Sequence, residues 1–218
     1  MKIQGLIFDF DGLILDTETP DLTAWMSIYS KYEGKFDFKS YISFIGKENQ
    51  WHLPVEQLIL QKPTLNKYKI FEEWQQIEKE LIEKQPISSG VLDYLKKAKE
   101  LGLKVGIASS SDRAWVSGHL MRLNIQNFFD TIHTVDDTGI PKPDPALYSL
   151  TLKSLGLCPK QVIAFEDSPN GISAAKAAGI YCVAVPNPVT NSLGIDHADL
   201  IINSLDKLSL IDLLNKFV

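Results

Sequence analysis

The chain has 218 residues, 44% of them hydrophobic, which is enough for the core of one α/β domain with an insertion. Its 22 basic and 27 acidic side chains give a formal net charge of −5, so binding to nucleic acid or an anionic membrane through bulk charge is disfavoured. Only two cysteines are present and no apolar run reaches the ~20 residues of a membrane helix, which argues against a disulfide framework and a membrane span and favours a cytoplasmic protein.

The first part of the chain predicts a buried strand followed by a helical block. Residues 2–8 are short, β-prone and almost entirely apolar, as in a strand at the centre of a parallel sheet. From residue 20 the pattern changes, and apolar side chains such as Trp25 and Tyr29 recur at helical spacing. Polar-rich amphipathic segments continue to residue 84, with no candidate for a buried strand.

From residue 85 onward, strands and helices alternate. We expect strands within 103–111, 128–135, 161–167, 180–186 and 198–204, and helices over 91–102, 112–124, 144–156, 170–179 and 206–217. Alternation of this kind predicts parallel β-α units and a doubly wound, Rossmann-like α/β fold. The predicted domains are an α/β core, formed by residues 1–16 and 85–218, and a helical cap domain, formed by residues 17–84.

Charged side chains follow several of these predicted strands. Asp9 and Asp11 come after the first strand, Glu166 and Asp167 after a later one, and Lys142 lies between two prolines before a helix. In open α/β sheets the carboxyl ends of the strands form the ligand-binding edge. Several carboxylates crowded there would repel one another without a cation, and oxygen ligands alone suit Mg²⁺.

The remaining residues at this edge are suited to a phosphate group. The Ser109 hydroxyl and the Ser110 amide lie at a predicted helix N-terminus, where anions are stabilised. Lys142 adds a positive charge that its flanking prolines could aim. The sequence therefore predicts a site that stabilises a transferring phosphoryl group.

Four stretches in this order resemble the haloacid dehalogenase (HAD) superfamily, in particular its phosphatase and β-phosphoglucomutase-like branch with a helical cap. They are DFDGLILDTE at 9–18, ASSS at 108–111, PKPDPALY at 141–148 and FEDSPNGISAAKAAG at 165–179. With the position of the cap, the resemblance spans nearly the whole chain.

The resemblance implies a role for each matching residue. Asp9 would be the nucleophile that forms an aspartyl-phosphate, and Asp11 would be the general acid and then the general base. The metal ligands would be Asp9, the main-chain carbonyl of Asp11, and Asp167, with Glu166 as a further ligand or a support for the others. Ser109, Ser110 and Lys142 would hold the phosphoryl oxygens.

Departures from the mutase pattern favour a Mg²⁺-dependent phosphatase acting on a small phosphorylated metabolite. Asp21 lies near the position where phosphoglucomutases carry a histidine, and Lys47 lies in the loop where they carry an arginine that binds the substrate phosphate. A phosphosugar mutase is the alternative, and a non-catalytic binding protein on the same fold is a third. Glu18 is expected either to contact the substrate or to cap the next helix, and Lys47 is a weaker substrate candidate.

The expected partner is the small phosphorylated metabolite itself, with no nucleic acid and no membrane. We expect a monomer or a weak dimer in the cytoplasm. The sequence does not identify the metabolite.

Overall fold

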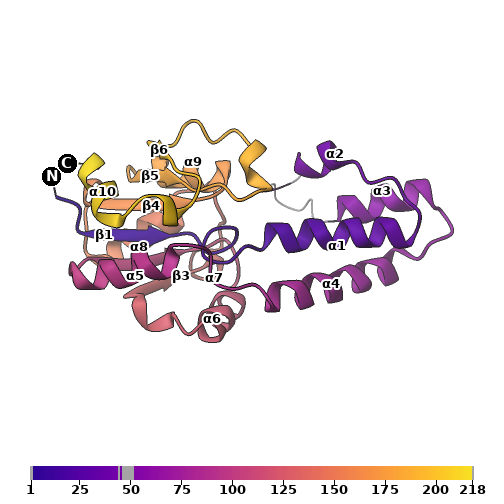
Figure 1. Cartoon of the computed structure of the whole chain (residues 1–218), viewed down its shortest axis with the longest axis horizontal. Coiled ribbons are helices and arrows are strands. Elements are labelled where there is room, and N and C mark those ends of the chain that lie inside the picture. The colour runs from indigo at the N-terminus through magenta and orange to yellow at the C-terminus, as the bar shows by residue number, and fades with distance from the viewer. Residues whose placement is uncertain (1, 44, 46–51, 218) are drawn as a thin grey trace.

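A computed structural model describes residues 2–43, 45 and 52–217 of the chain (Figure 1). In this part of the chain six strands form one sheet in the order β3-β2-β1-β4-β5-β6, and every neighbouring pair is parallel. The strands are β1 (Gly5–Phe8), β2 (Lys104–Ala108), β3 (Thr131–His133), β4 (Val162–Glu166), β5 (Tyr181–Ala184) and β6 (Leu200–Ile201).

Strand β1 lies in the middle of the sheet, with β2 on one side and β4 on the other. All four of its residues are buried, which explains why its sequence is apolar without alternation. The strand order reverses direction beside β1, and in such sheets the crevice at the carboxyl end of this switch point is where ligands bind.

Helices cover both faces of the sheet, so the doubly wound prediction is confirmed. Leu6 and Phe8 pack on the face covered by α5 (Val91–Glu100), α6 (Arg113–Arg122) and α10 (Leu210–Leu214). Ile7, between them in sequence, packs on the opposite face against α8 (Ala146–Leu155) and α9 (Pro169–Ala177). A short helix, α7 (Val135–Thr138), follows β3.

The described part of the segment after β1 forms only helices, and they lie at one end of the sheet (Figure 1). They are α1 (Glu18–Lys31), α2 (Phe38–Ile42), α3 (Leu53–Gln61) and α4 (Lys67–Glu83). These helices have their own apolar cluster, in which the rings of Trp25 and Trp74 stack with centroids 4.9 Å apart. The boundaries of a separate cap domain stay a prediction.

The last helix is shorter than its sequence pattern predicts. A single helix was expected over residues 206–217, but α10 spans only Leu210–Leu214, between two short 3₁₀ turns. The hydroxyl of Ser209 accepts a hydrogen bond from the amide of Asp212 at 3.1 Å, which starts a new helix at that point. Among the described residues, no helix has the length and apolarity needed to cross a membrane.

Candidate active site

Asp9 lies directly after β1 and extends its pairing with β4 by one residue. Its amide donates to the carbonyl of Phe165 at 3.0 Å, and this bond fixes Asp9 beside the end of β4. Its side chain is 10% exposed, and its Oδ1 lies 2.5 Å from Nζ of Lys142. The first predicted site residue is therefore held on both its backbone and its side chain.

Glu166 and Asp167 end β4 next to Asp9, as the strand prediction required. One carboxylate oxygen from each of these three buried residues lies within 4.8 Å of the others. Burial, followed by repulsion from Asp9, raises the pKa of Glu166 to about 7 and raises the pKa of Asp167 above its usual range. The three side chains form one acidic cluster at the switch point of the sheet.

Lys142 reaches this cluster from the loop before α8. Its Nζ donates to Asp9 Oδ1 at 2.5 Å and to Glu166 Oε1 at 2.6 Å, and its amide donates to the hydroxyl of Ser110 at 3.1 Å. Burial by itself would lower the pKa of Lys142, but the two carboxylates outweigh this effect and raise the pKa. Lys142 is therefore charged and offsets part of the negative charge of the cluster.

Two glycines provide the space that the acidic cluster occupies. A Cβ atom on Gly171 of α9 would lie 1.8 Å from Oε2 of Glu166. A Cβ atom on Gly12 would lie 2.1 Å from Oδ2 of Asp167, and the backbone of Gly12 has a φ of +75°, which also favours glycine. Any larger residue at either position would displace a carboxylate of the cluster.

The cluster fits a hard divalent cation. Its donors are carboxylate oxygens, and Oε2 of Glu166 is buried without a hydrogen-bond partner among the described residues. Burial and repulsion from Asp9 raise the pKa values of Glu166 and Asp167, so a bound cation would stabilise the charged forms of both groups. Asp9, Glu166 and Asp167 are the residues that could hold Mg²⁺.

Asp11 lies beyond Asp9, in the loop that turns at Gly12. The hydroxyl of Ser111 donates to its Oδ2 at 2.6 Å, and the indole Nε1 of Trp115 donates to its Oδ1 at 2.8 Å. Burial raises the pKa of Asp11 to about 6, although the bond from Ser111 partly opposes the shift. A carboxyl group with a pKa near neutrality can both give and take a proton at physiological pH.

The serines after β2 divide into a buried residue and two that face the cavity. The hydroxyl of Ser109 is fully buried and accepts a hydrogen bond from the amide of Ser111 at 3.0 Å. Ser110 and Ser111 line a cavity of about 260 Å³, together with Asp9, Asp11 and Lys142. Of the three, Ser109 is thus placed beneath the surface of the cavity, and Ser110 and Ser111 at it.

Asp167 and Glu18 also line this cavity. Glu18 is the first residue of α1, and burial followed by repulsion from nearby aspartates raises its pKa to about 8. Among the described residues, its carboxyl group has no hydrogen-bond partner. Lys47, the other proposed substrate residue, lies outside the described residues.

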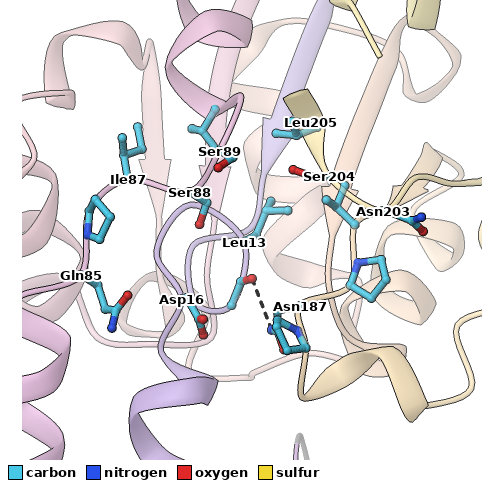
Figure 2. A pocket seen from close by; sticks show the side chains of 16 residues that line it. Leu13, Asp16, Gln85, Ile87, Ser88, Ser89, Asn187, Asn203, Ser204 and Leu205 are labelled. Carbon is cyan, nitrogen blue, oxygen red and sulfur yellow. Dashed lines mark hydrogen bonds between the residues drawn. The ribbon is translucent and has the colours of Figure 1, made fainter. Parts of the chain in front are cut away.

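A second cavity, of about 300 Å³, is lined in part by Gly12 and Leu13 (Figure 2). Its walls include the two segments that connect the sheet with the helical block, in which Asp16 and Gln85 lie, and the loop after β5. Asn187 in that loop donates to Asp167 Oδ2 at 2.8 Å and to the carbonyl of Gly12 at 3.4 Å. Asn187 therefore holds the carboxylate of Asp167 in place through a bond that comes from the loop after β5.

Sequence analysis missed three residues that contact the predicted groups: Asn187, Trp115 and Tyr148. The hydroxyl of Tyr148 donates to Glu166, next to the bond from Lys142. Asn187 had a usable signal, because it follows a predicted parallel strand and so had to lie at the same edge of the sheet. Trp115 and Tyr148 had none, because both lie inside predicted helices where aromatic residues normally serve packing.

Comparison with known families gives one match that covers most of the chain. Residues 6–185 match the family described as haloacid dehalogenase-like hydrolase. Among solved structures, a β-phosphoglucomutase from Clostridium difficile is 25% identical, with a TM-score of 0.72, and the match covers 99% of this chain and 97% of that one.

Two relatives illustrate the range of similar proteins. YhcW of Bacillus subtilis (strain 168), a candidate phosphatase by its name, is 42% identical over 98% of this chain and 97% of its own length. A protein of Thermotoga maritima named phosphorylated carbohydrates phosphatase is 31% identical over 82% of each chain.

Proposed function

The chain belongs to the haloacid dehalogenase-like hydrolase family, and from that premise we propose that it is a Mg²⁺-dependent phosphatase of small phosphorylated carbohydrates. The observation that carries the proposal is the single cavity lined by Asp9, Asp11 and Lys142. Its volume of about 260 Å³ lies just below the ~300–1,000 Å³ typical of ligand pockets, which suits a small metabolite. Relatives named for phosphorylated carbohydrates and for fructose 1-phosphate support the substrate class.

Asp9 is the proposed nucleophile. One of its oxygens attacks phosphorus and forms an aspartyl-phosphate, while the bond from phosphorus to the leaving oxygen breaks. The bond from the Asp9 amide to Phe165 and the ion pair with Lys142 hold the carboxylate in place before attack. Fixing the nucleophile in this way removes part of the entropy cost of reaching the transition state.

Asp11 is the proposed general acid and base. It gives a proton to the leaving alcohol, and it later takes a proton from the water that cleaves the aspartyl-phosphate. Its pKa of about 6 suits both steps.

Lys142 and Ser110 are the proposed donors to the phosphoryl oxygens, on which negative charge gathers, because both line the cavity beside Asp9. Bound at Asp9, Glu166 and Asp167, Mg²⁺ would supply further positive charge to the same oxygens.

The geometry of Asp21 favours hydrolysis over the mutase alternative. This residue lies near the position of a histidine in the mutases, but its Oδ2 accepts from the hydroxyl of Tyr41 at 2.7 Å and its Oδ1 from Nε1 of Trp74 at 2.8 Å. Asp21 thus joins three helices of the helical block, α1, α2 and α4, and both of its oxygens are occupied.

A panel of phosphorylated sugars with Mg²⁺ tests the proposal, with release of inorganic phosphate as the readout. We expect turnover of at least one sugar phosphate by the wild type, no turnover by Asp9→Asn, and unchanged turnover by Asp93→Asn, which alters an exposed aspartate on α5. Equal phosphate release by the wild type and Asp9→Asn would overturn the proposal. Interconversion of β-glucose 1-phosphate in the presence of a bisphosphate primer, without phosphate release, would identify a mutase instead.

A further inference from the structure

Both oxygens of Asp11 are held by donors from one segment far away in the sequence. Ser111 follows β2 and donates to Oδ2 at 2.6 Å, while Trp115 lies in the first turns of α6 and donates to Oδ1 at 2.8 Å. Neither donor belongs to the strand or loop that carries Asp11. The direction of this carboxyl group is therefore set by α6 and the loop before it.

The helix that carries Trp115 is held by core packing and by hydrogen bonds at its end. Val116 and Leu120 anchor α6 in the core, and the ring of His119 packs edge-on against the indole, with centroids 4.3 Å apart. At the end of α6, Arg122 donates to the carbonyl oxygens of Glu83 at 3.0 Å and Gln85 at 2.9 Å, where the chain returns from the helical block. The helix that carries Trp115 is thus fixed to the core and to this return crossing.

The two donors differ in chemistry, and this difference distinguishes the two oxygens of Asp11. An indole N–H can only donate, so Oδ1 must remain an acceptor whether or not Asp11 carries a proton. A serine hydroxyl can rotate, so the hydroxyl of Ser111 can turn away from Oδ2 when that oxygen carries a proton. The proton that Asp11 transfers therefore resides on Oδ2.

We propose that Trp115 is a positioning residue, which orients the carboxyl group of Asp11 so that the proton on Oδ2 reaches the leaving-group oxygen. This inference rests on the proposed phosphatase function. As the bond from Asp9 to phosphorus forms, the bond from phosphorus to the leaving oxygen breaks and its electron pair stays on that oxygen. The Oδ2–H bond of Asp11 breaks at the same time, and its proton goes to the leaving oxygen.

Leaving groups with different needs for a proton separate this role from a structural one. A nitrophenolate leaves without being protonated, whereas the alkoxide of a sugar phosphate needs the acid. For Trp115→Phe we expect kcat/KM to fall about tenfold with the sugar phosphate and to stay within about twofold with p-nitrophenyl phosphate. Asp11→Asn gives the largest loss of kcat/KM that removal of the general acid can cause, because general acid catalysis typically contributes ~10²–10⁴-fold.

The ratio of the two kcat/KM values is taken within one preparation, so a smaller folded fraction changes both values equally. If Trp115→Phe does not fold, 3-benzothienylalanine at position 115 keeps the shape of the indole and replaces the N–H with sulfur. Trp74→Phe is the matched control, because it removes an indole N–H bond of the same length, 2.8 Å, from Asp21, a half-buried aspartate in the helical block. We expect this control to leave the ratio unchanged.

A double-variant cycle completes the test. If Trp115 acts only through Asp11, Trp115→Phe has no further effect on the sugar phosphate in the Asp11→Asn background. An equal loss with both substrates, or a further loss in that background, would overturn the positioning role while leaving the phosphatase proposal intact. Failure of the wild type to hydrolyse either substrate would overturn the proposed function itself, and the positioning role with it.

Discussion

Lys142 lies 133 positions from Asp9 in the sequence, yet its Nζ is 2.5 Å from Oδ1 of that aspartate. The same ammonium group lies 2.6 Å from Oε1 of Glu166, so one lysine joins the ends of the two strands at the switch point of the sheet. The side chain of Lys142 is only 5% exposed, so water has little access to the carboxylates that it neutralises.

Replacing this lysine tests the electrostatics of the site. Lys142→Met leaves two buried carboxylates without their cation and removes positive charge from the proposed phosphoryl site, so we expect kcat/KM to fall at least ~100-fold. Lys153→Met, which changes an exposed lysine on the neighbouring α8, serves as the control and should keep normal activity. Retention of more than about a tenth of the activity by Lys142→Met would contradict this role.

A pair of glycines in helices tests the space around Glu166. Gly171→Ala places a Cβ atom 1.8 Å from Glu166 Oε2, so we expect the free energy of unfolding to fall by about 1–3 kcal/mol and activity to fall with it. At Gly118 of α6 a new Cβ meets nothing within 4 Å, so Gly118→Ala should gain up to about 1 kcal/mol from helix propensity. Urea unfolding measures both, and equal stability of the two variants would show that Glu166 is placed differently.

The support of Asp167 by Asn187 can be tested through the metal. Asn187→Ala removes the bond to Asp167, so we expect the Mg²⁺ concentration for half-maximal activity to rise about tenfold. Asn203→Ala is the matched control. Asn203 lines the cavity of about 300 Å³ together with Asn187 (Figure 2), and no bond from it to Asp167 is found among the described residues. An unchanged Mg²⁺ requirement in Asn187→Ala would rule out this supporting role.

Glu78 on α4 predicts a pH dependence of stability away from the acidic cluster. It lines a cavity of about 660 Å³ between α4 and α6, and burial followed by repulsion from Asp21 and Asp11 raises its pKa from 4.5 to about 8. Between these two values the folded state binds more protons at this group than the unfolded state does. The contribution of Glu78 to stability is therefore fully present below pH 4.5 and is lost as the pH rises towards 8.

The measurement for Glu78 compares urea unfolding of two variants across this pH range. Relative to the wild type, Glu78→Gln should become progressively more stable as the pH rises from 5 to 8. Glu72→Gln, an exposed change on the same helix, is the matched control. A difference for Glu78→Gln that stays constant from pH 5 to 8 would mean that its carboxyl group is not shielded from water.

The strands and the main site residues were predictable because their signals are local. An apolar run followed by Asp9 or by Asp167 defines both a strand and its carboxyl end, and parallel pairing then brings the two ends together. The strand before Asn187 indicated that this residue lies at the same edge, but its hydrogen bonds, like those of Trp115, depend on how distant segments pack. The last helix was predicted too long because apolar periodicity continued past Ser209, whose capping bond begins a new helix there.

The central position of β1 has a consequence for the way the protein is made. Among the strands of this sheet, β1 is synthesised before the others, yet one of its hydrogen-bonding edges has no neighbour until Val162–Glu166 has been synthesised. Until then the amide of Asp9 lacks the Phe165 carbonyl, and an apolar strand edge is open to pairing with other chains. A product truncated before β4 is therefore expected to be prone to aggregation, and no fragment of that length can assemble the acidic cluster.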